Sequence, residues 1–288
     1  MESYYHLCTD EGHPVIFFTR KEYEDAIGII ALCSKLFPSI RIITFELMDN
    51  HIHMLIKGNL VAIKEFFELF KKYLSRYFRE NGTPRNLSRF NAEYLFVDTD
   101  DYLKCVVAYV NRNGSVCYHD VTVFGYEWGA NRYFFNPESK IRYEFCRKPM
   151  TMAHRQQLMH SRKFDHVEGL YTVDGYVSPM SFCDIEKGEM IFQSARQYMY
   201  YIARNIEGSK EIAKRIGEKI YYDDYDLITV IQKISYDKFN TAPQVLTSLQ
   251  KMEMAKTLYY EYNANLKQLS RLLKLDKSVI QSIIPSIK

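Results

Sequence analysis

The stretch Leu47-Met48-Asp49-Asn50-His51-Ile52-His53-Met54-Leu55-Ile56 places two histidines on either side of one apolar residue, within a hydrophobic run. Such a run predicts a β-strand, along which side chains alternate between the two faces. His51 and His53 then point the same way and can offer two imidazoles to one ion, whereas Ile52 points into the core. The stretch therefore predicts a metal site built on a strand.

The elements around this stretch predict the fold. Aromatic and β-branched runs predict strands at residues 4–8, 15–18, 41–48, 51–57 and 93–97, and helical periodicity predicts helices at 20–36, 60–79 and 102–113. Asp49-Asn50 is the turn of the hairpin that carries the histidines. This order indicates an α+β fold, a ferredoxin-like split βαβ layout in which helices pack on one face of an antiparallel sheet.

Length and composition narrow the class of protein. The 288 residues, 47% of them apolar, can build one large domain or two ordinary ones. No apolar run reaches the roughly 20 residues that span a bilayer, and the N-terminus lacks a signal-peptide pattern, so we expect a cytoplasmic, nucleoid-associated protein without a membrane partner. The six scattered cysteines predict reduced core thiols rather than a disulfide framework or a zinc ribbon.

The net charge of +3 does not by itself indicate nucleic acid, but the basic residues are concentrated. Residues 64–85 carry six Lys and Arg against three Glu, and residues 251–288 carry seven against three acidic residues. These two segments are the candidate DNA contacts.

The remainder of the chain predicts two further parts after a catalytic domain at residues 1–135. Residues 136–224 read as a connector with helices at 195–205 and 209–219. Residues 225–288 predict a separate all-α domain whose last three helices, 252–262, 266–274 and 277–284, resemble a helix-turn-helix. Its candidate DNA contacts are Lys267, Arg271, Lys274 and Lys277. A helical bundle used for protein contact is the alternative.

A second cluster of chemistry lies in the 102–113 helix. Tyr109 and Asn113 are four residues apart, so they share one face of that helix. An amide oxygen can complete a hard-metal site begun by two imidazoles, and a phenol can attack a phosphodiester polarised by Mg²⁺ or Mn²⁺. The other histidines have no partner spacing and are predicted to be surface or structural residues: His6, His13, His119, His154, His160 and His166.

Three motifs over residues 4–135 resemble the HUH single-strand nucleases, most closely the REP-associated tyrosine transposases. The histidine stretch is similar to the family's Leu-Met-Pro-Asn-His-x-His-x-Leu-Ile, Tyr109-Val110-Asn111-Arg112-Asn113 to its Tyr-Ile-x-x-Asn-Pro, and Tyr126-Glu127-Trp128-Gly129 to its Tyr-Pro-Trp-Ser. The resemblance implies that His51, His53 and Asn113 bind the metal, and that Tyr109 forms a 5′-phosphotyrosine link with single-stranded DNA. Asp49 and Gly114 stand where the family has proline.

The resemblance also implies a partner, a single-stranded DNA hairpin, and either a monomer or a homodimer that exchanges the tyrosine helix. The long chain with its extra helical module slightly favours the monomer. Candidate phosphate contacts are Arg20, Lys71, Lys72, Arg76 and Arg79. One alternative is a hairpin-binding protein of the same fold that has lost catalysis. Another is an unrelated metal phosphodiesterase for small substrates, which would need more carboxylate ligands.

Overall fold

The computed structural model describes residues 2–118, 122–204, 212, 222–285 and 287. The chain divides into two compact units. The N-terminal unit comprises residues 1–115 and 120–208, and the C-terminal unit comprises residues 116–119 and 209–288.

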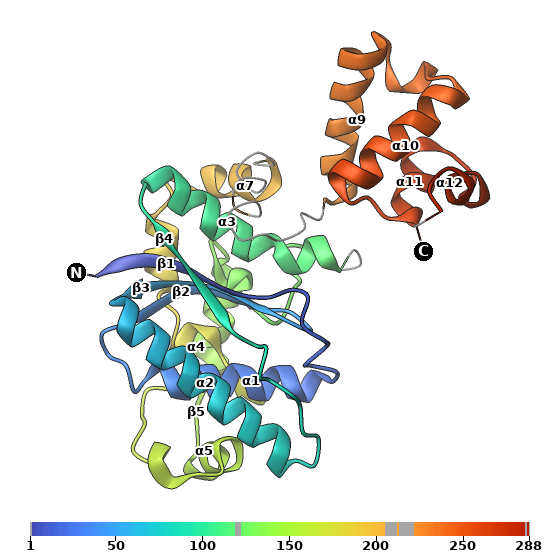
Figure 1. Ribbon diagram of the computed structural model, residues 1–288. Helices are drawn as coiled ribbons and strands as arrows, with labels where there is room; N and C mark the ends of the chain where they lie inside the picture. The colour runs from blue at the N-terminus through green and yellow to red at the C-terminus, as the bar shows by residue number, and fades with distance from the viewer. Residues whose placement is uncertain (1, 119–121, 205–211, 213–221, 286, 288) are drawn as a thin grey trace. The chain divides into compact units, whose positions relative to one another are not determined.

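A four-stranded antiparallel sheet organises the N-terminal unit (Figure 1). Its strands and the helices between them are β1 (Ser3–Thr9), α1 (Arg20–Ser34), β2 (Arg41–Leu47), β3 (Ile52–Gly58), α2 (Leu60–Glu80), β4 (Ala92–Val97) and α3 (Asp100–Cys117). The strand order is β2-β3-β1-β4, and every neighbouring pair is antiparallel. This is the split βαβ order that the sequence predicts.

Residues 15–18 do not form the predicted strand. The backbone N–H groups of Ile16 and Phe17 both donate to the carbonyl oxygen of Asp49, at 2.7 and 2.9 Å, so they do not enter a ladder. Both side chains are buried, which breaks the alternation that a half-buried strand requires. The segment is an extended connection between β1 and α1, held by the turn before β3.

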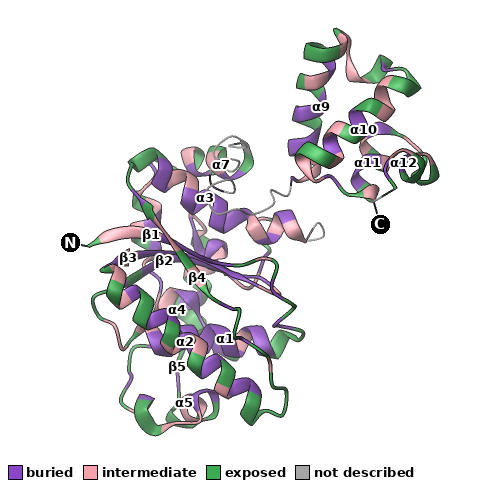
Figure 2. Ribbon diagram, in the orientation of Figure 1, coloured by how far each residue is buried: buried purple, intermediate pink, exposed green. Residues whose placement is uncertain are grey.

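Helices cover both faces of the sheet, which corrects the expectation of one covered face. Helices α1 and α2 lie on one side and α3 on the other, as Figure 1 shows. The cause is visible in the strands, because β2 is buried at six consecutive positions and β3 at five, so neither strand has a solvent face (Figure 2). Strands that are buried on both faces of a sheet need a cover on both.

The segment after α3 completes the N-terminal unit with short elements. They are η1 (Asn131–Tyr133), α4 (Pro137–Cys146), β5 (Lys148–Pro149), α5 (Met152–Met159), η2 (Arg162–Phe164), β6 (Tyr171–Val173), β7 (Tyr176–Val177), η3 (Pro179–Ser181), α6 (Ile185–Met190) and α7 (Ala195–Arg204). Strands β5, β6 and β7 form a second, small sheet.

This segment differs from the expected connector because it packs on the core helices. A Cβ on Gly28 of α1 would lie 2.5 Å from Leu158 of α5, so the two helices meet where glycine leaves room. The rings of Tyr73 on α2 and Phe164 meet edge to face at 4.9 Å. The predicted helix at 195–205 corresponds to α7, and the one predicted at 209–219 lies outside the described residues apart from Ile212.

The described part of the C-terminal unit from residue 222 onward is helical. Its elements are α9 (Asp224–Phe239), η4 (Pro243–Val245), α10 (Ser248–Tyr262), α11 (Leu266–Leu273) and α12 (Lys277–Ile283). Helix α10 begins four residues earlier than predicted, because Thr247 and Gln250 form a capping box that stabilises an additional first turn. Across the described residues of both units, no helix is long and apolar enough to cross a membrane.

Candidate active site

Three side chains form a row on the sheet face beneath α3. Glu46 of β2 is paired with His53 of β3, and His53 is paired with Cys8 of β1. Directly opposed residues in antiparallel strands point to the same face, and so do residues two positions apart, which brings His6 and His51 to that face. All five residues are buried, with exposed fractions of 6% or less.

Asn50 fixes the orientation of His51. The Asn50 side-chain amide donates to the carbonyl oxygens of Glu11 and His13, at 2.5 and 3.1 Å. Its side-chain oxygen lies 2.6 Å from Nδ1 of His51, and an oxygen can only accept, so His51 carries its proton on Nδ1. The lone pair on Nε2 of His51 is therefore the one presented for an ion, and Asn50 acts as the partner that sets the tautomer.

His53 has a histidine neighbour that the sequence analysis missed. Nε2 of His6 lies 3.2 Å from Nδ1 of His53, and both rings are fully buried. His6 was predicted to be a surface or structural residue, and its surface placement is wrong. A usable signal was present, because His6 and Cys8 repeat the i, i+2 spacing of His51 and His53 on a second strand.

Burial keeps the imidazoles of this site neutral. It lowers the pKa of His6 to about 3 and that of His51 to about 4, the latter opposed by the nearby charge of Asp10. The pKa of His53 is lowered well below its usual value by burial and by the charges of His51 and His6. Neutral imidazole is the form that binds metal, so the two motif histidines suit an ion at neutral pH.

Helix α3 brings Tyr109 over the histidines of the same chain. The centroid of the Tyr109 ring lies 5.5 Å from that of His53 and 5.9 Å from that of His6, with the planes at 90° and 71°. The centroid of His51 is 5.0 Å from that of His53. Residues from three separate segments of the chain thus form one cluster.

Asn113 lies one turn beyond Tyr109 on α3, beside an anchored glycine. The N–H of Gly114 donates to the buried Glu46 carboxyl at 2.6 Å. Burial raises the pKa of Glu46 well above its usual range, and the Gly114 bond opposes that shift. Glu46 stands opposite His53 in the sheet, so this bond fixes the last turns of α3 against β2, next to the strand that carries His53.

The same contact explains why glycine stands where the family has proline. Proline has no N–H and could not donate to Glu46. In addition, a Cβ at position 114 would lie 2.3 Å from the ring of Tyr126, whose hydroxyl donates to the carbonyl of Leu47 at 2.8 Å. Asp49 is the other position at which the family has proline. Its backbone carbonyl accepts the hydrogen bonds from Ile16 and Phe17, and a proline carbonyl could accept them as well.

A buried polar network holds the middle of α3. Asn111 is hydrogen-bonded to Thr44 of β2, and its amide donates to the hydroxyl of Tyr198 of α7 at 2.8 Å. The Tyr198 hydroxyl donates to Asn131, whose own amide donates back to the Asn111 carbonyl at 2.9 Å. A satisfied buried network of this kind specifies one arrangement, so α3 has a fixed seat between the sheet and α7.

The predicted phosphate contacts on α2 are not close to this cluster. Lys71, Lys72, Arg76 and Arg79 lie on α2, which covers the opposite face of the sheet (Figure 1). Arg20 begins α1 and is bound to Glu24 and Glu127, at 3.0 and 2.5 Å, with its guanidinium over the ring of Trp128. These side chains do not join the histidines and Tyr109.

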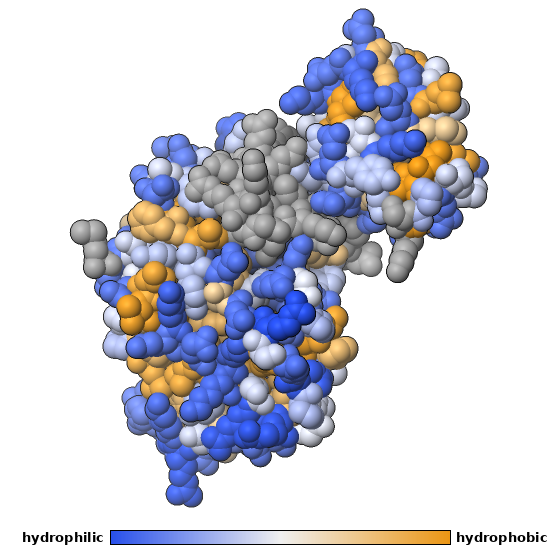
Figure 3. All heavy atoms as spheres, viewed as in Figure 1, coloured by the Kyte–Doolittle hydropathy of each residue, from blue (hydrophilic) through white to orange (hydrophobic). Residues whose placement is uncertain are grey.

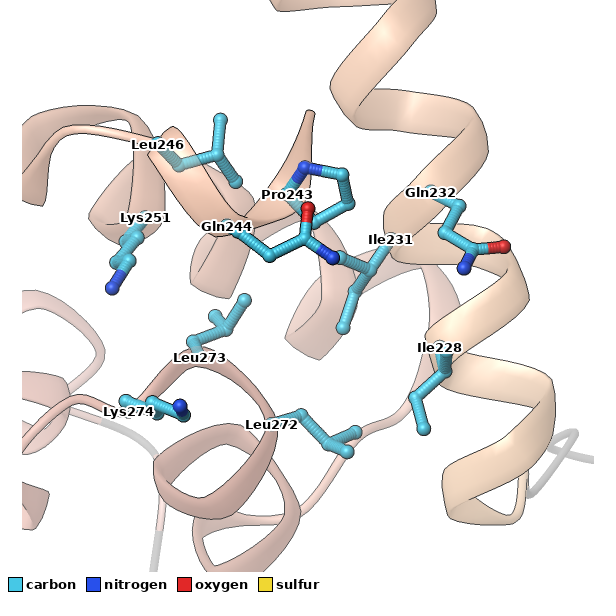
Figure 4. A pocket seen from close by; sticks show the side chains of 10 residues that line it. All are labelled: Ile228, Ile231, Gln232, Pro243, Gln244, Leu246, Lys251, Leu272, Leu273 and Lys274. Carbon is cyan, nitrogen blue, oxygen red and sulfur yellow. The ribbon is translucent and has the colours of Figure 1, made fainter. Parts of the chain in front are cut away.

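The four basic candidates of the C-terminal unit are all exposed: Lys267, Arg271, Lys274 and Lys277. Arg271 is tied to Asp224 by contacts of 2.5 and 2.7 Å. Lys274 lies with Lys251 at the edge of a pocket among α9, η4, α10 and α11 whose remaining lining is largely apolar (Figure 4). The surface of this unit seen in Figure 3 is mainly hydrophilic, with scattered apolar side chains.

The two motif histidines could hold a divalent ion. His51 presents a lone pair on Nε2, and His53 is neutral and on the same face. Asn113, the predicted third ligand, lies one turn beyond Tyr109 on α3.

Residues 4–113 match a protein-family model described as "Transposase IS200 like". A search of curated proteins and a search of solved structures each found no match. The matched segment contains β1 through the Tyr109–Asn113 turn of α3, and so includes every element of the cluster described above. Over this segment the chain is similar to IS200-like transposases.

Proposed function

We propose that the protein cleaves and rejoins single-stranded DNA at hairpins, with Tyr109 as the nucleophile and His51, His53 and Asn113 as ligands of Mg²⁺ or Mn²⁺. The observation that carries the proposal is the 5.5 Å separation between the Tyr109 and His53 rings within one chain. A nucleophile and a metal ligand at this separation can reach one phosphodiester together.

In the proposed reaction, the phenol oxygen of Tyr109 attacks phosphorus and forms a phosphotyrosine bond to the new 5′ end of the downstream DNA fragment. The bond from phosphorus to the 3′ oxygen breaks, and that oxygen takes up the proton released by the phenol. The bound ion would polarise the phosphodiester and stabilise its developing charge. A 3′ hydroxyl later attacks the same phosphorus and returns Tyr109 to its free form, so the strand is rejoined without a nucleotide cofactor.

The surroundings of Tyr109 support this role. The phenol is buried and is held by α3, whose seat on Glu46 and Asn111 limits its movement. A nucleophile held near its target recovers much of the entropy that a free collision would lose. Tyr102 is also buried, two turns earlier on the same helix, and is the matched control for Tyr109.

For the second part of the chain we propose that residues 225–288 add DNA affinity through exposed Lys267, Lys274 and Lys277. Arg271 serves the domain itself through its ion pair with Asp224. Exchange of one of these lysines for glutamine should weaken binding of all sequences about equally and reduce the salt dependence, because a phosphate contact carries no base information.

The test is a covalent-adduct assay. A labelled single-stranded hairpin oligonucleotide is incubated with the protein and Mn²⁺, and the products are separated on a denaturing gel. We expect a DNA-linked protein band from the wild type and from Tyr102→Phe, and none from Tyr109→Phe. Chelation of the ion should also remove the band.

Tight hairpin binding without any adduct in the wild type would overturn the catalytic proposal and support a binding protein of the same fold. An adduct that survives in Tyr109→Phe would overturn the assignment of the nucleophile.

A further inference from the structure

The first strand contributes a pair of potential metal ligands that the proposed reaction does not use. His6 and Cys8 lie two residues apart on β1 and share the face that carries His53. Side-chain donor atoms of His6, Cys8 and His53 all lie within 4.8 Å of one another. The three residues are 0%, 3% and 0% exposed, so the cluster is inside the protein.

The spacing of this cluster suits a tetrahedral ion. Zn²⁺ bound by two imidazoles at about 2.0–2.1 Å places the two nitrogens about 3.3 Å apart. In this protein, Nε2 of His6 and Nδ1 of His53 are 3.2 Å apart. The thiolate of a cysteine and the nitrogens of two histidines are ligands that zinc prefers, whereas Mg²⁺ and Mn²⁺ prefer oxygen.

We propose that His6, Cys8 and His53 form a second metal site, selective for a thiophilic divalent ion such as Zn²⁺ and distinct from the site of the catalytic ion. Binding displaces the proton of the Cys8 thiol, and three protein ligands leave one tetrahedral position for a water molecule.

The two sites share the His53 ring through different nitrogens. Nδ1 of His53 faces His6, and an ion held together with His51 would bind Nε2 of the same ring. A ring that binds ions through both nitrogens must give up its remaining N–H proton, so simultaneous occupation is unfavourable. Zinc at the second site should therefore weaken binding of Mn²⁺ by about tenfold or more, and Mn²⁺ should weaken zinc binding by the same factor.

The experiment uses Co²⁺ as a spectroscopic substitute for zinc, with the reduced full-length protein and no DNA. We expect a thiolate-to-cobalt charge-transfer absorption and the intense visible bands of tetrahedral Co²⁺. Addition of Zn²⁺ should remove both. Cys8→Ser should abolish the charge-transfer absorption and lower zinc affinity by at least about tenfold.

Two control variants and one alternative variant make the result specific. Cys146→Ser removes an exposed cysteine from the same N-terminal unit and should leave the spectrum unchanged. His51→Ala removes a proposed ligand of the catalytic ion and should also keep the thiolate band. His6→Phe retains the thiol but should weaken Co²⁺ binding by about tenfold, which covers the case in which Cys8→Ser does not fold.

A wild-type protein that shows no thiolate band, or a band that persists in Cys8→Ser, would overturn the second site. Because this readout requires neither DNA nor Tyr109, its failure is separable from failure of the adduct assay.

Discussion

Strands β2 and β3 are buried on both faces of the sheet, and the two faces differ in their chemistry. The face under α1 and α2 presents Leu7, Phe45, Ile52, Met54 and Ile56, none more than 1% exposed. The face under α3 presents His6, Cys8, Thr44, Glu46 and His53, none more than 3% exposed. One set of strands therefore carries an apolar core on one side and a buried polar site on the other.

The stability of the unit and its proposed chemistry therefore depend on different faces of the sheet. Burial of apolar side chains stabilises the fold, while buried polar groups must find partners or cost free energy. The pairing register of the strands keeps the two faces apart. A shift of a strand by one residue would turn its histidines toward α1 and α2. Substitutions on each face should accordingly change different observables.

The largest effect is expected from His51→Ala on the polar face. Loss of one of two imidazole ligands should reduce the rate of adduct formation by about a thousandfold at fixed Mn²⁺. The midpoint of thermal unfolding should change little. The variant loses the hydrogen bond between His51 and Asn50, but the apolar face of the sheet is intact. Adduct kinetics and a melting curve on the same sample check this. Unchanged kinetics would remove His51 from the metal site.

The apolar face should give the reverse result. Phe67 of α2 is fully buried and packs against Phe70 and Phe90, with ring centroids 6.1 and 5.7 Å away. Phe67→Ala should lower the free energy of unfolding by about 3–5 kcal/mol. The adduct rate per folded molecule should stay close to that of the wild type. Urea denaturation combined with single-turnover kinetics measures both quantities. A large fall in the adduct rate per folded molecule, alongside the loss of stability, would contradict the separate roles of the two faces.

An intermediate effect is expected at Glu46, which positions α3 without touching DNA in our account. Glu46→Leu leaves the Gly114 N–H without its acceptor, which costs about 1–3 kcal/mol and releases the end of α3. The adduct rate constant should fall about tenfold while hairpin affinity is retained. Glu46→Gln keeps a neutral acceptor and should restore most of the rate. A loss of hairpin affinity with an unchanged rate constant would contradict the positioning role.

The smallest effect is expected in the pH dependence of stability. Only the polar face carries buried histidines that titrate. The folded pKa values of His6 and His51, about 3 and about 4, lie below the unfolded value of about 6.5. Below pH 6.5 the unfolded chain therefore binds protons that the folded chain does not, and stability present above pH 6.5 is lost as the pH falls.

In the metal-free protein, each of these histidines should lower the free energy of unfolding by about 1 kcal/mol as the pH falls from 6.5 to 5.5. Chemical denaturation in a chelating buffer at several pH values measures the slope of the free energy of unfolding against pH. His6→Phe should reduce the slope, and Phe67→Ala should leave it unchanged. A slope that is the same in all three proteins would mean that the histidines are not buried as neutral groups.

The order of strands and helices could be predicted from residues 4–113, because hydrophobic periodicity and turn residues are local signals. The strand at 15–18 could not be judged correctly, since its backbone bonds go to Asp49, more than thirty residues later. The proximity of His53 and Tyr109 was expected from the resemblance of the two motifs to the HUH family. The contact between His6 and His53 depends on the pairing of β1 with β3, 47 residues apart, and no local pattern contains that register.

The coverage of the second sheet face was also beyond the local pattern. The predicted layout places helices on one face of the sheet, whereas the polar residues of the other face are buried under α3, which Glu46, Asn111 and Tyr198 hold in place. Two of these three residues, Glu46 and Tyr198, lie outside the three family motifs. The polar character of a buried face is easily mistaken for exposure until its cover is known.

The central claim is that the polar face and α3 together make Tyr109 the covalent carrier of DNA. The most direct measurement is mass spectrometry of the proteolysed adduct formed with a hairpin oligonucleotide and Mn²⁺, which locates the modified residue among the 24 tyrosines. We predict the nucleotide remnant on Tyr109, joined through its phenol oxygen to a 5′ phosphate. A remnant on any other residue, or on a 3′ phosphate, would contradict the account.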